Sequence, residues 1–366
     1  MTALSTTFST ASSTTSSKAI GPVAASAPLP APPAAPAVLD RCRALVRPAL
    51  DEAVGRLHPW VGEMAAYSFG WCEVGGAPVG ASGGKGVRQA LAVLGAEAAG
   101  APARAGVAAA VSVELVHTFS LLHDDIMDGD PTRRSRPTVW KAYGTGPAVL
   151  AGDALFALAV ETLAAAPGGA GGVRLLSRAL AELVHGQADD LLFAARPWSG
   201  HGRVRPEAYR AMAEGKTGAL LGCAAALGAV LGGAPEATVT ALDRAGRHLG
   251  IAFQVIDDLL GVWGDPAVTG KPVHGDLRAG KKTFPVLAAL ESPAPAARRL
   301  ARLLESGGDP AEAAVLAEEA GGRAAALAEA RRQVSAVEAA LAGVPLRTRA
   351  AGDLRSLLDF LVRRDL

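Results

Sequence analysis

The chain has 366 residues, of which 50% are hydrophobic and only 4% aromatic, so it is long enough to bury one large core or two small ones. Its formal net charge is +1, which gives no global field to attract nucleic acid or an acidic membrane surface. Three cysteines at unrelated spacings, Cys42, Cys72 and Cys223, indicate reduced thiols in the cytoplasm and exclude a disulfide or metal framework. Any function that depends on charge must therefore be local.

Residues 1–38 differ in composition from the rest of the chain. They are rich in Ser and Thr and then in Pro and Ala, and Lys18 is the only charged residue before Asp40. Such a segment cannot bury enough apolar area to offset its chain entropy, so we expect a disordered tail. A spacer, a transit peptide that lacks arginine, and a docking segment for a partner are the open interpretations. The basic and apolar regions of a secretory signal are absent.

Residues 39–366 read as one helical domain. Ala and Leu dominate and β-branched residues are few, so helix propensity is favourable nearly everywhere. Clusters of Gly and Pro separate the helices, at residues 74–84, 166–172 and 264–276. The uncharged run between Lys216 and Glu236 is rich in Gly and Ala, which favours a buried core helix over a membrane span. The predicted fold class is all-α.

A cluster of aspartates follows an apolar helical run. Asp124 and Asp128 are one turn apart on a shared face, and Gly129 and Pro131 then stop the helix. The macrodipole is already negative at this end and like charges one turn apart repel, so the position is unfavourable for acids. A solvated acidic surface is the alternative interpretation. Three arginines that follow directly weigh against it, Arg133, Arg134 and Arg136.

A second apolar helical segment, residues 250–265, also carries paired aspartates, Asp257 and Asp258. Two such helix ends suggest two helices that face each other across one cavity. Paired carboxylates are hard oxygen ligands that suit Mg²⁺, and this ion favours phosphate oxygens as co-ligands. An EF-hand is excluded because Ile126 occupies a ligand position. The acids therefore predict magnesium, and the arginines predict phosphate.

Several motifs in this order resemble the trans-isoprenyl diphosphate synthases: HDDIMD at 123–128, the arginine pair at 133–134, FQVIDD at 253–258, and the later GKP and KK. The resemblance spans roughly residues 40–366. It implies the isoprenoid synthase fold, a large antiparallel helix bundle around a central cavity, and a homodimer. It also implies Mg²⁺-dependent head-to-tail condensation of isopentenyl diphosphate with an allylic diphosphate, with three ions expected when the diphosphate is bound.

The resemblance assigns roles to individual positions. The Mg²⁺ ligands would be Asp124, Asp128 and Asp257. Isopentenyl diphosphate would lie against Lys85, Arg88, His117 and Arg134. The allylic diphosphate would lie against Arg133, Lys271 and Lys281, with Asp258 nearby. Lys216, Thr217 and Gln254 would line the allylic pocket, where a carbonyl or amide dipole could stabilise a carbocation without capturing it. Gln187 and Asp190 suit a cavity-facing helix and a helix surface equally well, so they are left out of the predicted site.

Two positions depart from the family pattern. Position 261 is Gly where the second aspartate motif normally ends in a third acid, and this change is expected to weaken the surroundings of the metal without removing Asp257. The loop GKGVRQ at 84–89 lacks a further Arg and a Pro, so looser binding of isopentenyl diphosphate is expected.

Phe119 precedes Asp124 by a little over one helical turn, where a bulky ring can act as a floor for the growing chain. The small Ser120 lies beside it, and nothing is inserted inside DDIMD. This combination resembles the geranylgeranyl diphosphate synthases, so a C20 product is predicted, with the C15 farnesyl diphosphate as the alternative.

Two other functions compete with a prenyltransferase. A class I terpene cyclase would need an Asn/Ser/Glu metal triad where this chain has FQVIDD. A non-catalytic or scaffold subunit of a prenyltransferase assembly would accommodate Gly261, the GKGVRQ loop and the long tail. The tail also resembles the Pro/Ala-rich extensions of bacterial relatives that are cargo of encapsulin shells. An encapsulin shell is therefore an expected partner, and its interior an alternative location to the open cytoplasm, although an ordinary linker explains the composition equally well.

Overall fold

The structure, a computed structural model, describes residues 34–79, 84, 86–265 and 273–363. Most of the predicted tail and the site candidates Lys85 and Lys271 lie outside these described residues. The first helix begins at Ala35, ahead of the domain boundary expected at residue 39.

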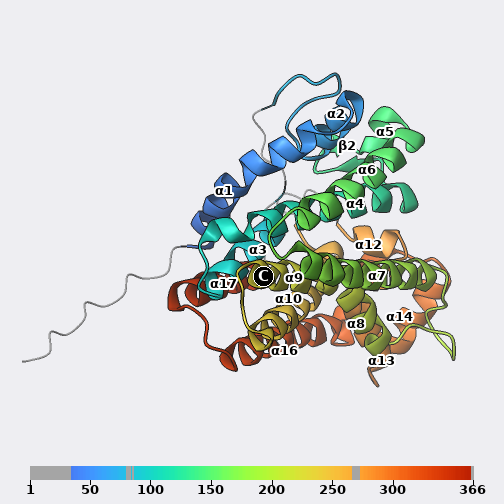
Figure 1. The fold of residues 1–366 in the computed structure, drawn as a ribbon. Coiled ribbons are helices and arrows are strands. Elements are labelled where there is room, and N and C mark those ends of the chain that lie inside the picture. The colour runs from blue at the N-terminus through green and yellow to red at the C-terminus, as the bar shows by residue number, and fades with distance from the viewer. Residues whose placement is uncertain (1–33, 80–83, 85, 266–272, 364–366) are drawn as a thin grey trace, which may run out of the picture. The chain divides into compact units, whose positions relative to one another are not determined.

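Helices make up nearly all of the described chain, which confirms the all-α prediction (Figure 1). The first half contains α1 (Ala35–Gly55), α2 (Pro59–Ser68), α3 (Val87–Ala98), η1 (Ala103–Gly106), α4 (Val107–Met127), α5 (Val139–Tyr143), α6 (Thr145–Ala164) and α7 (Gly169–Ala194). The second half contains α8 (Pro206–Ala213), η2 (Glu214–Gly218), α9 (Ala219–Leu231), α10 (Glu236–Trp263), α12 (Gly275–Arg278), α13 (Phe284–Glu291), α14 (Pro295–Glu305), α15 (Pro310–Glu319), α16 (Gly322–Ala342) and α17 (Thr348–Arg363).

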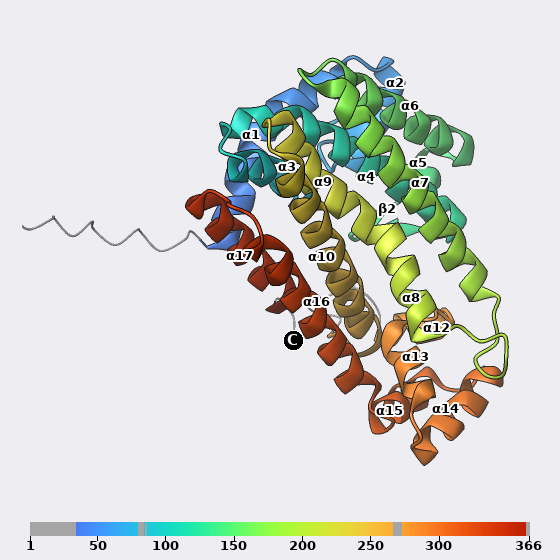
Figure 2. The ribbon, with the colours of Figure 1, turned by 60° about the horizontal axis from the view of Figure 1, so that its bottom comes forward.

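The long helices form a bundle with α9 and α10 at its centre (Figures 1 and 2). Helix α9 packs on α3, α7 and α10, while α16 lies along the other side of α10 and α6 along α4. Every residue from Ala219 to Ala229 is buried, because Ala and Gly side chains let neighbouring helices approach on all sides. The prediction of a buried core helix in the uncharged run is therefore confirmed.

Two of the described helical stretches are long and apolar enough to cross a membrane by length and composition alone. In the first, Ala103–Met127, 61% of the apolar window is buried inside the protein, as expected for a core helix. In the second, Thr145–Ala164, only 39% is buried, so α6 presents an apolar face to its surroundings.

Helix α4 ends at Met127 as the sequence predicts, with Asp128 at the C-cap and Gly129 in the left-handed region (φ 68°). Helix α10 differs from the prediction because it continues beyond Asp257 and Asp258 to Trp263, and the buried Leu259 and Val262 extend its apolar face. The second aspartate pair therefore lies within the last turns of a helix rather than at its end.

A short hairpin, β1 (Thr132–Arg133) and β2 (Arg136–Pro137), follows α4 and was not predicted. Its two turn residues, Arg134 and Ser135, have φ angles of 52° and 60°. Two successive positive φ angles are the geometry of a tight hairpin turn, which usually requires Gly or Asn. Neither residue type is present, so no turn could be predicted here, and the strained backbone marks a position held by its surroundings.

Candidate active site

The first aspartate motif lies beside Lys216. The pKa of Asp124 is raised to about 6, mainly by burial and also by the charge of Asp128, while Lys216 opposes the rise. Lys216 Nζ lies 2.5 Å from Asp190 Oδ2, so this ammonium group is held between two helices. A carboxylate that is costly to ionise in the empty protein is stabilised when a cation binds next to it.

The close approach of α7 positions Lys216. This residue lies on η2, a single turn of π-helix, a distortion that is frequent at functional sites. A Cβ atom on Gly186 would lie 2.2 Å from the backbone nitrogen of Lys216, so only Gly fits there. One turn further along α7, Asp190 then reaches the Lys216 side chain.

Asp190 and Gln187 were left out of the predicted site, and the structure places both in it. Asp190 pairs with Lys216. Gln187 is 7% exposed, and neither atom of its amide has a hydrogen-bond partner among the described residues. A buried amide of this kind is suited to a polar ligand. Their spacing in the sequence puts both residues on one face of α7, next to the close contact at Gly186. This spacing is the signal that could have identified them.

Lys281 joins the first aspartate motif from the opposite side. Its Nζ lies 3.8 Å from Asp128 Oδ2, and the side chain is 52% exposed. Lys281 follows α12, which comes after the second aspartate motif in the chain. Lys281, from the segment after α10, thus contacts Asp128 at the end of α4.

The two aspartates of the second motif have different surroundings. Asp258 is buried and accepts hydrogen bonds from the Tyr209 hydroxyl (2.5 Å), the Phe284 backbone N–H (2.8 Å) and the Gln254 amide (3.3 Å). With three donors, this carboxylate holds α8, α10 and α13 together. Asp257 is half-buried, and its charge acts on the guanidinium of Arg88.

Thr217 and Gln254 are joined by a hydrogen bond that continues to Asp258. The Thr217 hydroxyl donates to the Gln254 side-chain oxygen at 3.1 Å, while the Gln254 amide nitrogen donates to Asp258. The amide is thereby fixed in one orientation, because each of its ends has a distinct partner. Both residues lie together as the sequence predicted.

A second cluster lies further back along α4, around His117. Arg88 donates to His117 Nε2 at 3.2 Å, which requires the neutral ring. Burial and the neighbouring arginines lower the pKa of His117 well below its usual value. Burial also lowers the pKa of Arg88 to about 10, opposed by Glu114 and Asp257, and its Nε has no partner among the described residues. A buried guanidinium with an unpaired N–H is suited to bind an anion.

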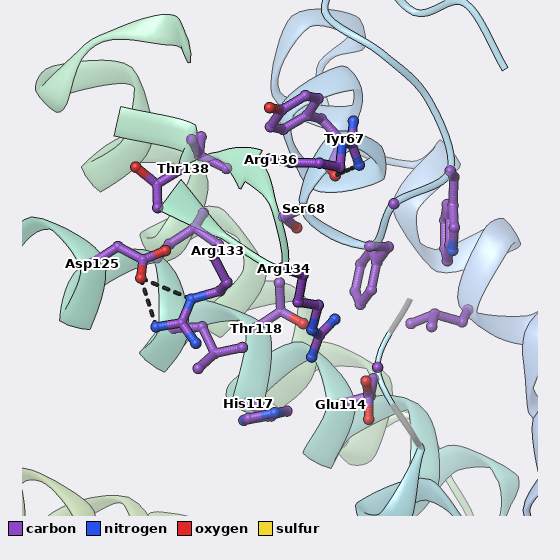
Figure 3. Close-up of a pocket in the computed structure, with 18 of the residues that line it drawn as sticks. Tyr67, Ser68, Glu114, His117, Thr118, Asp125, Arg133, Arg134, Arg136 and Thr138 are labelled. Atoms are coloured by element: carbon purple, nitrogen blue, oxygen red, sulfur yellow. Dashed lines mark hydrogen bonds and ion pairs between the residues drawn. The ribbon is translucent and has the colours of Figure 1, made fainter. Parts of the chain in front are cut away.

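A cavity of about 210 Å³ opens beside this cluster (Figure 3). His117 and Glu114 of α4 line it together with Arg133 and Arg134 of the hairpin. Arg136, the third arginine after the aspartates, also lies on its wall. Arg43 and Arg47 of α1 lie there too and were not predicted, because they are far from the motifs in the sequence. Four or more cations around one cavity favour a diphosphate-sized anion.

The hairpin presents its two arginines differently. Arg133 makes an ion pair with the buried Asp125, with nitrogen–oxygen distances of 2.6 and 2.8 Å (Figure 3). Arg134 packs against Gly84, because a Cβ there would lie 2.4 Å from its guanidinium. Burial lowers the pKa of Arg134, opposed by Glu114. The two predicted clamp residues, Arg133 at the end of β1 and Arg134 in the turn, thus both lie along the cavity.

Phe119 lies on α4 between His117 and the first aspartate motif, and its ring packs against two other rings. Its centroid is 4.8 Å from the His123 ring and 5.6 Å from the Phe156 ring of α6. The ring is partly buried and packs against the main core. This position is consistent with a floor formed by side chains of α4 and α6.

The donor set fits magnesium only if a ligand completes it. Among the described residues, no three His, Cys, Asp or Glu side chains come close enough to hold a metal ion by themselves. Mg²⁺ is typically held by one or two carboxylates together with phosphate oxygens and waters. The half-buried Asp124, with its raised pKa and Asp128 one turn away, supplies carboxylates of this kind.

An all-α bundle with paired aspartates, a diphosphate-sized cationic cavity and an apolar floor defines an isoprenoid synthase. The polyprenyl synthetase family model matches residues 78–319. The chain belongs to this family, the trans-isoprenyl diphosphate synthases, and is a prenyltransferase that elongates prenyl chains.

Individual relatives agree with this assignment. A (2E,6E)-farnesyl diphosphate synthase of Mycobacterium bovis is 44% identical over 337 residues, covering 89% of this chain and 92% of the relative. A geranylgeranyl diphosphate synthase of Mycobacterium tuberculosis is 42% identical over 337 residues, covering 90% and 94%. The crystal structure of a polyprenyl synthetase from Streptomyces coelicolor A3(2) is similar with a TM-score of 0.83 and 46% identity, covering 89% and 99%.

Proposed function

We propose that the protein condenses isopentenyl diphosphate with an allylic diphosphate in a Mg²⁺-dependent reaction, with geranylgeranyl diphosphate as the main product. One observation carries the proposal. Helix α4 presents Asp124 and Asp128 to the ammonium groups of Lys216 and Lys281, and presents His117 to the arginine cluster further back. Two anion sites on one helix suit two diphosphate substrates.

The side chains have separate tasks in this reaction. Mg²⁺, when bound by Asp124, Asp128 and Asp257, would supply positive charge to the leaving diphosphate. Lys216, Lys281 and Arg133 would add fixed positive charge around the same group as the allylic carbon–oxygen bond breaks.

The second substrate would be held by Arg88 and Arg134, with the neutral His117 as a hydrogen-bond partner of Arg88. The fixed amide of Gln254 would direct its oxygen dipole toward the allylic pocket, and the apolar walls of the bundle would keep water from the cation. Lys85 and Lys271 are proposed partners of the two diphosphates from the sequence alone.

The proposed C20 product depends on Phe119. The mycobacterial relatives at 44% and 42% identity carry names for C15 and C20 products, so overall similarity does not separate the two lengths. The contact between the Phe119 and Phe156 rings supports a floor more than one turn from Asp124. The alternative is farnesyl diphosphate.

The test is an incubation of the purified protein with Mg²⁺, radiolabelled isopentenyl diphosphate and a C5, C10 or C15 allylic primer, followed by sizing of the products. The proposal expects C20 label that disappears when EDTA is added and in the Asp124→Asn variant. A correctly folded wild-type protein that incorporates no label with any primer would refute it and favour a scaffold subunit. Products that stop at C15 would support the alternative.

We also propose a homodimer with α6 at its interface. Val149, Leu150 and Phe156 of α6 are 39–50% exposed, and Leu191 and Leu192 of α7 are also exposed. An apolar surface of this kind on a soluble protein marks an interaction site. Light scattering after size-exclusion chromatography should give twice the monomer mass of 36.9 kDa, and Leu150→Glu should reduce it.

A cytoplasmic location, with docking of the tail to an encapsulin shell, is the remaining proposal for the partners. Its support is the Pro- and Ala-rich composition of residues 1–38. Co-expression with a candidate shell protein, comparing the full chain with a variant that starts near Asp40, tests it. Equal loading of both proteins would refute the docking.

A further inference from the structure

The side chain of Arg247, on α10, lies among three carboxylates from three elements. Its Nε donates to Asp243 Oδ2, one turn earlier on the same helix, at 2.7 Å. Its Nη1 donates to Glu182 of α7 and lies 3.7 Å from Oε1 of Glu214, the first residue of η2. One guanidinium group therefore links α7, η2 and α10.

The turn η2 is packed between α7 and α10 through glycines on both sides. On the α10 side, a Cβ atom on Gly250 would lie 2.3 Å from Gly218 Cα, and a Cβ atom on Gly218 would lie 2.9 Å from the Arg247 carbonyl oxygen. On the α7 side, a Cβ atom on Gly215 would lie 2.8 Å from the Glu182 carbonyl oxygen. Backbones approach closely across such glycines, but no side chains interlock there, so polar contacts at the edge of the turn fix its position.

The contacts of Arg247 lie about two helical turns from those of the candidate active site, on the same helices. Gln254, which accepts a hydrogen bond from Thr217, follows Arg247 by about two turns on α10. Asp190, which pairs with Lys216, likewise lies about two turns along α7 from the carboxylate that Arg247 binds there. The same three elements are thus joined at two levels, once by Arg247 and once by Lys216 and Thr217.

The carboxylates around Arg247 depend on its charge. Asp243 Oδ1 is buried and has no hydrogen-bond partner among the described residues, so Arg247 supplies the neutralising charge for this group. Burial opposes the charged guanidinium, but hydrogen bonds to Glu182 and Asp243 raise the pKa of Arg247 above its ordinary value. Without the guanidinium, Glu182 and Glu214, which face the same nitrogen of Arg247, would repel each other and push the turn away from α7.

We propose that Arg247 is a positioning residue for the allylic part of the site. By holding η2 against α7 and α10, it places the Lys216 ammonium group and the Thr217 hydroxyl where the allylic diphosphate and the developing cation need them. The cluster of Arg88 and His117 belongs to α3 and α4, so binding of isopentenyl diphosphate does not depend on Arg247. This inference rests on the proposed function, because it concerns residues of the same site.

Steady-state kinetics of Arg247→Gln, with each substrate varied in turn, tests the proposal. The KM for the allylic primer should rise and its kcat/KM should fall by roughly 10–100-fold, because a small displacement of Lys216 weakens its contact with the diphosphate. The KM for isopentenyl diphosphate should stay at the wild-type value. Arg247→Lys keeps a positive charge but lacks the fork that reaches three carboxylates, so its allylic KM should lie between those of wild type and Arg247→Gln.

Arg41→Gln is the matched control. Arg41 of α1 also joins carboxylates on different helices, Glu97 of α3 and Asp353 of α17. A loss of folded protein lowers the apparent kcat and leaves both KM values unchanged, so Arg41→Gln should lower the melting temperature without changing either KM. A rise in the allylic KM alone therefore separates positioning from a general effect on stability.

Amide hydrogen exchange of residues 214–218 in the substrate-free protein gives a second readout, which needs no turnover. Exchange there should be faster in Arg247→Gln than in the wild type, and no faster in Arg41→Gln, because only the first variant releases the turn.

An unchanged allylic KM in folded Arg247→Gln would overturn the inference, as would equal rises in both KM values. If Arg247→Gln does not fold, Arg247→Lys decides, and wild-type values of both KM in that variant would overturn the inference. Absence of turnover by the wild-type protein would overturn the proposed function, and the exchange rates would then decide whether Arg247 holds the turn.

Discussion

Asp128 and Lys281 lie 3.8 Å apart, and this contact joins the first aspartate motif to the segment that follows the second. Lys281 is half exposed and its partner belongs to a predicted metal-binding motif. A diphosphate with Mg²⁺ would offer Lys281 a stronger anionic partner than Asp128. Lys281 is therefore placed where a diphosphate held by the first motif would meet it.

Lys281→Met is expected to lower kcat/KM for the allylic substrate by roughly 10–100-fold, because it removes fixed positive charge from the leaving diphosphate. Stability should hardly change, since an exposed ion pair contributes about 0–1 kcal/mol. Steady-state kinetics and a thermal melt check both statements. Lys141→Met is the control, as Lys141 is an exposed lysine of α5 that has no assigned role in the site. Unchanged kinetics in Lys281→Met would remove this residue from the site.

Asp124→Asn is expected to stabilise the metal-free protein while it abolishes activity. The pKa of Asp124 is raised to about 6 in the folded state, so ionising this carboxyl group costs stability as the pH rises from about 4 to about 6. The variant should therefore gain on the order of 1–2 kcal/mol in unfolding free energy at pH 8 and almost nothing at pH 4. Urea unfolding with EDTA present measures the difference. A loss of stability at pH 8 would contradict the assigned environment.

His117→Gln is expected to make the protein less sensitive to acid. The folded-state pKa of His117 lies well below its usual value, so the wild type loses stability as the pH falls below about 6.5, where the unfolded chain takes up a proton. Gln keeps an acceptor for Arg88 and does not titrate. Unfolding free energies at pH 7.5 and pH 5 should differ less in the variant. An equal acid sensitivity in both proteins would show that His117 is protonated in the fold.

Phe119→Ala is expected to lengthen the products beyond C20, because it removes the ring that packs against Phe156 on the proposed floor. Chromatography of dephosphorylated products measures the length. Ser120→Ala is the neighbouring control and should leave the distribution unchanged, since Ser120 bonds only to the His117 carbonyl oxygen among the described residues. The same product length in wild type and Phe119→Ala would refute the floor.

Much of the fold could be predicted from the sequence because its signals are local. The Ala- and Leu-rich composition favours helix, and Gly129 and Pro131 end α4 next to Asp128 as expected. The hairpin could not be predicted, because Arg134 and Ser135 adopt left-handed backbone angles that only their surroundings explain.

The sequence could not predict the parts of the site that depend on contacts between segments far apart in the chain. The pair of Lys216 with Asp190 requires the close approach at Gly186, and a helix surface explains Asp190 equally well in the sequence. The different environments of Asp257 and Asp258 follow from Tyr209 and Phe284, which are remote in the chain. Asp276, whose carboxylate covers Gly261, is likewise remote in the chain.

We propose that α4 and α10 hold one diphosphate between them through shared magnesium. A crystal structure with Mn²⁺ and a non-hydrolysable allylic diphosphate analogue is the decisive experiment, because anomalous scattering locates each ion. We expect ions that contact Asp124 and Asp128 on one side and Asp257 on the other, all touching the same diphosphate. Ions at only one of the two helices, or a diphosphate bound away from both, would refute the shared site.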